Sequence, residues 1–301
     1  MKRPLVGALA SALLTAAALT GAGAGPAAAS PAQRAAAAPA GHHGKQDHGH
    51  GHGHGVQATP DFAGTVALSN CSGSLVRVPQ SQPDDPALVL TNGHCLETGM
   101  PAPGTVVVDQ PSSRRFTLLD ADAHDTGTLQ ATKVAYSTMT KTDITLYQLG
   151  SSYRQITDRY GIQPLDISPE HPVKGTDITV VSGYWKQTYS CQIDDFVYEL
   201  DEGGWTFKDS IRYTPACDTI GGTSGSPIID DATGDVVGVN NTGNENGERC
   251  TINNPCEVDE NGNVTVHQGI NYGQQTYLIT DCIGVGNKLD LGLPECELPN
   301  P

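Results

Sequence analysis

From about residue 60 onward, the chain alternates between short apolar runs and clusters of turn residues. Stretches rich in Val, Ile, Leu or Thr predict strands at residues 64–68, 74–78, 87–90, 105–108, 145–149, 177–181, 227–229, 236–239 and 263–266. Turn sequences such as Asp230-Asp231 and Asn261-Gly262 separate them, and the second is a hairpin signal. Only residues 152–160 have a weak helical pattern. Many short strands with frequent turns predict an all-β sandwich or barrel.

The first 58 residues have a different composition. Residues 1–29 are interpreted as a secretory signal peptide, with Lys2 and Arg3 before an apolar run and Ala27-Ala28-Ala29 as the cleavage site. The apolar run is too short and too rich in alanine to span a membrane. Residues 30–58 form a low-complexity segment of Ala, Pro, Gly and His without apolar periodicity, which we expect to be disordered and which is a candidate pro-segment.

Six histidines cluster in this segment, and neutral imidazole is a good ligand for copper, nickel and zinc. They are His42, His43, His48, His50, His52 and His54. We interpret the run as a spacer without a metal cofactor, and metal binding by this segment is the alternative. The remaining residues, 59–301, are numerous enough to bury one compact core.

Charge and cysteine content narrow the class of protein. The chain has 17 Lys and Arg against 33 Asp and Glu, for a net charge of −16, which argues against a nucleic-acid partner and suits a soluble, exported monomer. The eight cysteines all follow the signal peptide, and none forms a Cys-x-x-Cys pair. In an exported chain this pattern predicts four disulfides, although spacing alone does not determine which cysteines pair.

Three short motifs carry the candidate chemistry, in the order His, Asp, Ser. They are residues 90–95 (LTNGHC), 142–146 (TDITL) and 221–227 (GGTSGSP). A serine hydroxyl is a weak nucleophile at neutral pH and needs an imidazole to take its proton. The imidazole in turn needs a carboxylate to fix its tautomer and stabilise its cation. The three motifs therefore predict a Ser-His-Asp triad for acyl transfer.

With these motifs, residues 61–285 resemble the chymotrypsin/trypsin-like serine proteases, and look closest to the bacterial branch that includes the glutamyl endopeptidases. Residues 71–75 (CSGSL) and the strand at 237–239 (VGV) are also similar to family segments. The resemblance implies two packed six-stranded antiparallel β-barrels. It makes Ser224 the nucleophile, His94 the general base and Asp143 the orienting acid, and it places the oxyanion hole at the backbone N–H groups of Gly222 and Ser224.

The resemblance also suggests how the cysteines pair. It implies a disulfide between Cys71 and Cys95 beside the histidine motif, and one between Cys191 and Cys217 before the serine motif. Proximity in sequence suggests the pairs Cys250–Cys256 and Cys282–Cys296.

Substrate preference depends on two positions. Asp218 lies six residues before Ser224, where the trypsin branch has the aspartate that binds Lys or Arg of the substrate. The alternative is that Asp218 only stabilises its own turn. Asn240 stands where glutamyl endopeptidases have a histidine. We therefore expect little preference for Glu before the scissile bond, and a weak preference for basic or neutral polar residues.

The sequence thus predicts a secreted serine endopeptidase that acts on protein or peptide substrates and needs no cofactor. The alternatives are an inactive, protease-like binding module and a metal-binding protein in which the histidine run is the functional segment. Thr223 precedes the serine where trypsin-like zymogens have Asp, so activation by a buried N-terminus is not supported. The acidic stretch 259–263 is interpreted as a hairpin turn because Val264 stands where a calcium loop needs its turn glycine and no well-placed terminal glutamate follows.

Overall fold

The computed structural model describes residues 59–301, which fall within one compact unit. The predicted signal peptide and the six clustered histidines lie outside the described residues. In the part of the chain that the structure describes, no helix combines the length and apolarity needed to cross a membrane.

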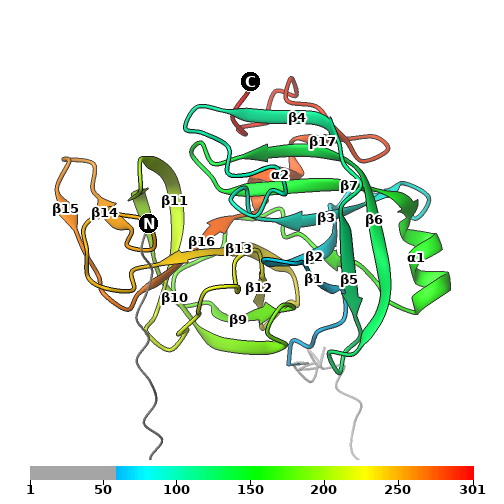
Figure 1. Ribbon diagram of the computed structural model, residues 1–301, viewed down its shortest axis with the longest axis horizontal. Coiled ribbons are helices and arrows are strands. Elements are labelled where there is room, and N and C mark those ends of the chain that lie inside the picture. Colours follow the sequence, from blue (N-terminus) through cyan, green and yellow to red (C-terminus); the bar gives the residue numbers. More distant parts are fainter. Residues whose placement is uncertain (1–58) are drawn as a thin grey trace, which may run out of the picture. The chain divides into compact units, whose positions relative to one another are not determined.

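The first half of this unit is a closed antiparallel barrel of six strands. The order β1-β5-β6-β7-β3-β2 closes because β1 also pairs with β2 (Figure 1). Its strands are β1 (Thr65–Ala67), β2 (Ser72–Arg77), β3 (Pro86–Thr91), β5 (Arg115–Leu119), β6 (Asp125–Thr138) and β7 (Ile144–Ser152). Two more strands lie on its edges: β4 (Val106–Pro111) pairs with β6, and β8 (Leu165–Asp166) runs parallel to β2.

The second half is a ring-like antiparallel sheet. Six of its strands follow the order β11-β16-β13-β12-β9-β10, and β10 pairs back with β11. They are β9 (Asp177–Ser182), β10 (Gln187–Glu202), β11 (Trp205–Tyr213), β12 (Pro227–Asp230), β13 (Val236–Gly243) and β16 (Asn271–Gln275). The hairpin of β14 (Cys256–Val258) and β15 (Val264–Thr265) extends this sheet beyond β10, and β17 (Ile283–Gly284) pairs with β18 (Lys288–Leu289) separately.

Helices contribute little to the fold. The helix α1 (Tyr153–Tyr160) begins at Ser152, whose hydroxyl accepts the Gln155 N–H while the Gln155 side chain accepts the Ser152 N–H. This capping box satisfies two N–H groups that would otherwise lack partners. The helix ends at Gly161, which has the left-handed conformation that glycine adopts without strain. The other helix, α2 (Tyr277–Thr280), is a single turn.

Each half has its own hydrophobic core, and a further cluster joins the first barrel to the C-terminal segment. Leu75, Phe116 and Tyr147 are among the buried side chains inside the first barrel. The core of the second sheet includes Ile178, Ile211, Tyr213 and Ile228. The joining cluster packs first-barrel residues such as Leu88 and Tyr136 against Val236 of β13 and against Ile279, Ile283 and Leu298. Because this packing is buried, it fixes the two halves relative to each other.

The β10–β11 hairpin provides a second connection between the halves. The Trp205 indole donates a hydrogen bond to the carbonyl of Pro101 at 2.9 Å. The backbone of Lys141 donates to Thr206 O at 3.1 Å and accepts from the Lys208 N–H at 2.7 Å. The hairpin of the second sheet therefore packs on the first-barrel segment that directly precedes Asp143.

The all-β prediction is confirmed, whereas several strands were not predicted from the sequence. The predicted runs correspond to all or part of β1–β4, β7, β9, β12, β13 and β15, and the weak helical pattern corresponds to α1. The long strands β6, β10 and β11 were missed. These strands alternate exposed and buried positions irregularly, and β10 and β11 also contain many charged residues, so their sequences lack the long apolar runs on which the prediction rested.

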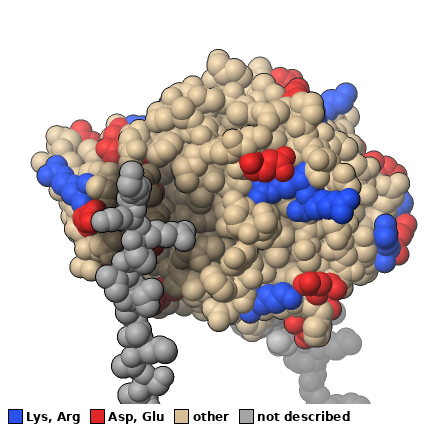
Figure 2. All heavy atoms as spheres, viewed as in Figure 1, with Lys and Arg blue, Asp and Glu red and all other residues tan. Residues whose placement is uncertain are grey.

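The four predicted disulfides are all present. Cys71 pairs with Cys95, Cys191 with Cys217, Cys250 with Cys256, and Cys282 with Cys296, and no described cysteine is free. The turn prediction for residues 259–263 is also confirmed, because the Asp259 carboxylate accepts the N–H groups of Asn261 and Asn263 between β14 and β15. On the face shown in Figure 2, Lys and Arg side chains are interspersed with Asp and Glu and do not form one basic patch.

Candidate active site

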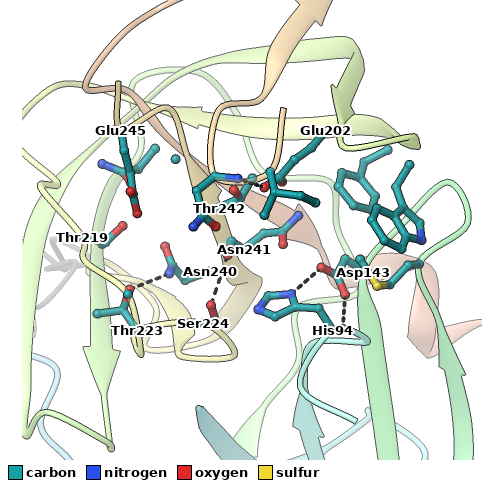
Figure 3. Close-up of a pocket in the computed structure, with 18 of the residues that line it drawn as sticks. His94, Asp143, Glu202, Thr219, Thr223, Ser224, Asn240, Asn241, Thr242 and Glu245 are labelled. Atoms are coloured by element: carbon teal, nitrogen blue, oxygen red, sulfur yellow. Dashed lines mark hydrogen bonds and ion pairs between the residues drawn. The ribbon is translucent and has the colours of Figure 1, made fainter. Parts of the chain in front are cut away.

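The three predicted triad residues lie in one cleft between the two halves of the fold. His94 and Asp143 come from the first barrel, on the loop after β3 and directly before β7, respectively. Ser224 comes from the second sheet, on the loop before β12. Figure 3 shows the His94 ring between Ser224 and Asp143. The fold thus brings together three motifs that are far apart in the sequence.

Asp143 holds His94 through two hydrogen bonds. Its Oδ2 lies 2.7 Å from Nδ1 of the imidazole, and its Oδ1 accepts the backbone N–H of His94 at 2.9 Å. The Asp143 side chain is 1% exposed and the His94 side chain 20% exposed. An ionised carboxylate at Nδ1 keeps the proton on that nitrogen, so Nε2 is left unprotonated on the side of Ser224.

A hydrogen bond from Asn92 and tight packing around Gly93 hold His94 and Asp143 in place. Asn92 donates its side-chain amide to the carbonyl of Asp143 at 2.8 Å. A Cβ on Gly93 would lie 2.1 Å from the carbonyl oxygen of Thr138 and 2.8 Å from Asp143 Oδ1. Only glycine fits here, which explains its place beside His94 in the motif.

Ser224 does not hydrogen-bond to His94 in this structure. Its hydroxyl donates to the backbone carbonyl of Asn241 at 3.3 Å. A hydrogen bond between a nucleophile and its base often tightens only when substrate is bound.

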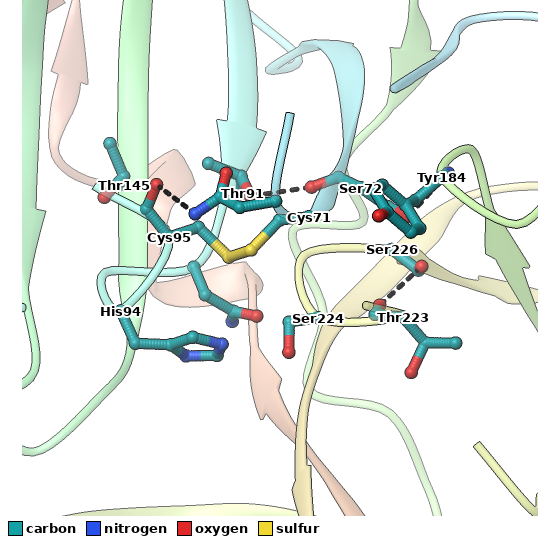
Figure 4. The surroundings of a disulfide bond; sticks show 12 residues. Cys71, Ser72, Thr91, His94, Cys95, Thr145, Tyr184, Thr223, Ser224 and Ser226 are labelled. Carbon is teal, nitrogen blue, oxygen red and sulfur yellow. Dashed lines mark hydrogen bonds between the residues drawn. A yellow bond between two sulfur atoms is a disulfide. The ribbon is translucent and has the colours of Figure 1, made fainter. Parts of the chain in front are cut away.

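The Ser224 loop is anchored to both halves of the fold. The N–H of Ser72 on β2 donates to the carbonyl of Ser224 at 2.8 Å, and the N–H of Gly225 donates to the carbonyl of Asn240 at 2.9 Å. A Cβ on Gly225 would lie 2.2 Å from both the carbonyl oxygen of Ser72 and Oγ1 of Thr91. Figure 4 shows this region beside the disulfide between Cys71 and Cys95. That disulfide joins the Ser72 strand to the His94 loop.

Two backbone N–H groups beside Ser224 are available to a ligand. The N–H groups of Gly222 and Ser224 donate no hydrogen bond to any residue between 59 and 301, whereas the intervening Thr223 N–H donates to Ile220 O at 3.0 Å. Gly222 has a φ of 92°, a conformation that favours glycine. Unpaired N–H groups next to a nucleophile are what an oxyanion hole requires.

The two predicted specificity residues have different environments. Asn240 is 2% exposed and lines the cleft, and both ends of its amide are paired at 3.1 Å, with Oγ1 of Thr223 and with the Tyr213 hydroxyl. Asp218 is exposed and does not line the cleft, so the structure does not place its carboxylate at the base of a pocket. Because an unpaired carboxylate is costly to bury, the surface position is the favourable one.

Other acidic groups line the cleft instead. Figure 3 shows Glu202 on the side of His94 and Glu245 on the side of Thr219. Together with Asp143 they are three carboxylates, and no Lys or Arg is among the described lining residues. Apolar side chains of Met100, Met139, Trp205, Phe207 and Ile252 also contribute to the lining. Apart from Asp143, the sequence motifs predicted none of these lining residues. The residues lie on the β10–β11 hairpin and on loops that have no recognisable local sequence pattern.

Electrostatics raise the pKa of two groups in the cleft. Burial lowers the pKa of His94, but the charge and hydrogen bond of Asp143, together with the charge of Glu202, outweigh this and raise it above 6.5. Burial raises the pKa of Glu202 itself. A hydrogen bond from the Asn253 N–H at 2.7 Å and the charge of His94 offset this effect only in part. Glu202 and His94 therefore influence each other's ionisation across the cleft.

This coupling gives a pH prediction for any reaction in which His94 acts as base. Only neutral imidazole accepts a proton, so kcat/KM should fall as the pH drops through the raised pKa of His94. Glu202→Gln removes one charge that raises this pKa, so we expect the acidic limb of the kcat/KM profile to move to lower pH. The exposed Glu260→Gln variant is the control and should leave the limb in place. An unchanged limb in Glu202→Gln would show that Glu202 does not act on His94.

One cluster resembles a metal site only in composition. Cys71, His94 and Cys95 have potential ligand atoms within 4.8 Å of one another. Both sulfurs are bonded to each other in a disulfide, however, and a disulfide offers no thiolate to an ion.

Comparison with known proteins agrees with this architecture. The fold is that of the trypsin-like serine proteases. The model of the trypsin-like peptidase domain matches residues 71–239, more than half of the chain, and the protein belongs to this family. No curated protein matches the chain.

Solved structures of several proteases match the chain at low sequence identity and with TM-scores below 0.5. The active form of the Rv3671c protease from M. tuberculosis has 15% sequence identity and a TM-score of 0.46, and the match covers 80% of this chain and 85% of that one. The MamO protease domain from Magnetospirillum magneticum has 13% identity and a TM-score of 0.46 over 74% and 97% of the two chains. A Glu endopeptidase in complex with MPD has 16% identity and a TM-score of 0.39 over 71% and 85%.

Proposed function

We propose that this protein is a secreted serine endopeptidase that hydrolyses peptide bonds through an acyl-enzyme on Ser224. The observation that carries the proposal is the position of the His94 ring in one cleft, between the Asp143 carboxylate that binds its Nδ1 and the Ser224 side chain. A base, its orienting acid and a hydroxyl nucleophile are the set that acyl transfer needs.

The proposed reaction has two halves. Ser224 Oγ attacks the peptide carbonyl carbon while His94 Nε2 takes the hydroxyl proton, and the N–H groups of Gly222 and Ser224 stabilise the oxyanion. His94 then gives the proton to the departing amine as the peptide C–N bond breaks, which leaves an ester on Ser224. In the second half, water attacks this ester, with His94 again as base, and the free carboxylic acid and hydroxyl form. No step in this scheme requires a cofactor.

The compartment and assembly are part of the proposal. Four disulfides support folding in an oxidising environment, in line with export by the predicted signal peptide. We expect a monomer that acts on peptides or unfolded proteins.

A serine-directed label tests the proposal against an inactive, protease-like binding module. The purified protein is treated with a fluorophosphonate and digested, and the modified peptide is identified by mass spectrometry. In parallel, a peptide library is used to detect hydrolysis. Modification at Ser224 together with peptide cleavage supports the endopeptidase. A protein that neither reacts nor cleaves any peptide would instead be the binding module.

The cleft also supports a preference for basic side chains before the scissile bond. The acidic groups of the cleft favour a cation, and the paired, neutral amide of Asn240 offers no positive charge to a glutamate. Glu245 is exposed at the cleft, and Figure 3 shows it on the same side as Thr219 and Thr223, across from His94. We assign the basic preference to Glu245 in place of Asp218.

Two matched variants test this assignment. Glu245→Gln should lower kcat/KM for a substrate with Arg before the scissile bond by about fivefold, because an exposed ion pair contributes up to about 1 kcal/mol. A matched substrate with Leu should be cleaved at an unchanged rate. Asp218→Asn removes the other candidate carboxylate and should leave both rates unchanged. If only Asp218→Asn lowers the Arg rate, or if a Glu substrate is preferred, the assignment is wrong.

A further inference from the structure

The turn between β9 and β10 packs against the loop that precedes Ser224. The indole Nε1 of Trp185 in this turn donates a hydrogen bond to the carbonyl oxygen of Gly221 at 2.8 Å. A Cβ on Gly222 would lie 2.8 Å from the same Nε1 atom and 3.1 Å from Cδ1 of Tyr184. The two aromatic side chains thus contact the loop where a side chain on residue 222 would stand.

The contacted loop forms a β-turn. The Thr223 N–H donates to Ile220 O, which closes a four-residue turn with Gly221 and Gly222 at its centre. A φ of 92° at Gly222 is typical of a type II turn, whereas a type I turn has a negative φ there. The two types differ mainly in the orientation of the central peptide, and glycine adopts either one at little cost.

The hydrogen bond from Trp185 selects one orientation of this central peptide. In a trans peptide, the carbonyl oxygen of Gly221 and the N–H of Gly222 point in opposite directions. Because the carbonyl is held toward the indole, the Gly222 N–H points away from it. The peptide flip to a type I turn would break this hydrogen bond and reverse the N–H.

We infer that Trp185 is a positioning residue for the oxyanion hole: it holds the peptide between Gly221 and Gly222 in the orientation that presents the Gly222 N–H to the reacting carbonyl. The inference rests on the proposed function, since the Gly222 N–H matters only if Ser224 attacks a carbonyl group. Trp185 itself touches no reacting atom. It acts through the backbone of the turn.

Ser72 anchors the Trp185 turn and the nucleophile loop together. Its hydroxyl accepts the Tyr184 N–H at 3.0 Å, and its own N–H donates to the carbonyl of Ser224 at 2.8 Å. The hydroxyls of Ser72 and Ser182 lie 3.1 Å apart, and Ser182 Oγ also accepts the Trp185 N–H at 3.3 Å. Figure 4 shows Ser72 and Tyr184 close to the Ser224 loop. Ser72 of β2 therefore anchors both the turn that carries Trp185 and the loop that carries Ser224.

The test removes the indole donor and keeps an aromatic side chain. In Trp185→Phe, and in a variant with 3-benzothienylalanine that replaces the Nε1–H by sulfur without changing the ring shape, the turn loses its preference for type II. Since an intramolecular hydrogen bond changes the equilibrium between the two turn types by about a factor of five, we expect kcat to fall by about two- to fivefold. KM should stay within about twofold, because this N–H stabilises the developing oxyanion more than the bound substrate.

A tetrahedral inhibitor supplies a readout that a merely structural role would not change. The affinity for a peptide boronic acid, which forms a tetrahedral adduct on the serine, should fall by the same factor as kcat/KM, whereas the affinity for a product peptide should stay constant. Tyr198→Phe is the control, since Tyr198 is a similarly exposed aromatic residue on β10 that does not line the cleft. It should leave both affinities unchanged.

The outcomes separate this inference from the proposed function. An active parent enzyme with an unchanged kcat in both Trp185 variants overturns the inference alone. A loss of boronic-acid and product-peptide affinity in equal measure, together with a lower melting temperature, also overturns it, since Trp185 would then only stabilise the fold. A parent protein that hydrolyses no peptide and takes no serine label contradicts the proposed function itself.

Discussion

Ser224→Ala is expected to reduce peptide hydrolysis by about a million-fold while leaving the fold intact. The substitution removes only the oxygen that would form the ester, and in a serine protease the loss of the triad serine or histidine alone costs nearly as much as the loss of all three members. The lost hydrogen bond to the Asn241 carbonyl, at 3.3 Å, should lower the free energy of unfolding by no more than about 1 kcal/mol. Turnover of a fluorogenic peptide by the purified variant and its parent measures the effect.

Two controls separate loss of chemistry from loss of structure. The thermal unfolding midpoint of Ser224→Ala should match the parent, and the variant should no longer react with a fluorophosphonate. His94→Ala should lose a similar amount of activity, because the serine and its base act as a unit. If Ser224→Ala retains more than a few per cent of the parent turnover, Ser224 is not the nucleophile.

Asp143→Asn has the second largest expected effect, a loss of about four orders of magnitude in kcat. In the parent, one carboxylate oxygen accepts the His94 backbone N–H at 2.9 Å and the other lies 2.7 Å from Nδ1. An asparagine has only one acceptor oxygen for these two donors. If that oxygen keeps the backbone N–H, the amide NH₂ faces Nδ1 and forces the imidazole proton onto Nε2. A protonated Nε2 cannot take the proton of Ser224.

The kinetics of Asp143→Asn should show a lower kcat with little change in KM, because the side chain of Asp143 is only 1% exposed and acts through His94. Asp158→Asn, an exposed change on α1, is the matched control and should keep the parent turnover. A kcat in Asp143→Asn within tenfold of the parent would mean that Asp143 does not set the imidazole tautomer.

The sequence predicted the candidate site better than the architecture around it. The motifs at 90–95, 142–146 and 221–227 each combine a reactive residue with the glycines or strand residues that its local backbone requires, as Gly93 and Gly225 show. These requirements are local, so they are visible in a short stretch. The strands β6, β10 and β11 were missed because their stability comes from pairing with neighbouring strands, β6 with β7 and β10 with β11, and not from long apolar runs of their own.

Specificity and positioning could not be deduced in the same way. Asp218 has the right sequence distance from Ser224, yet it lies outside the cleft, and Glu245 and Glu202 line the cleft without a motif. Trp185 contacts Gly221 from a hairpin 36 residues away. Each of these facts depends on how two distant segments pack, and no local pattern encodes that packing.

The sequence by itself determined the all-β class, the three chemical groups, and the local backbone conformations that glycine makes possible. It determined these because turn residues, strand composition and a reactive side chain act over a few neighbouring positions. The tertiary structure decided which groups share a cleft, which charges act on His94 and which hydrogen bonds are formed. These properties depend on distances of a few ångströms between atoms from the two halves of the fold, and such distances are set only when both halves pack together.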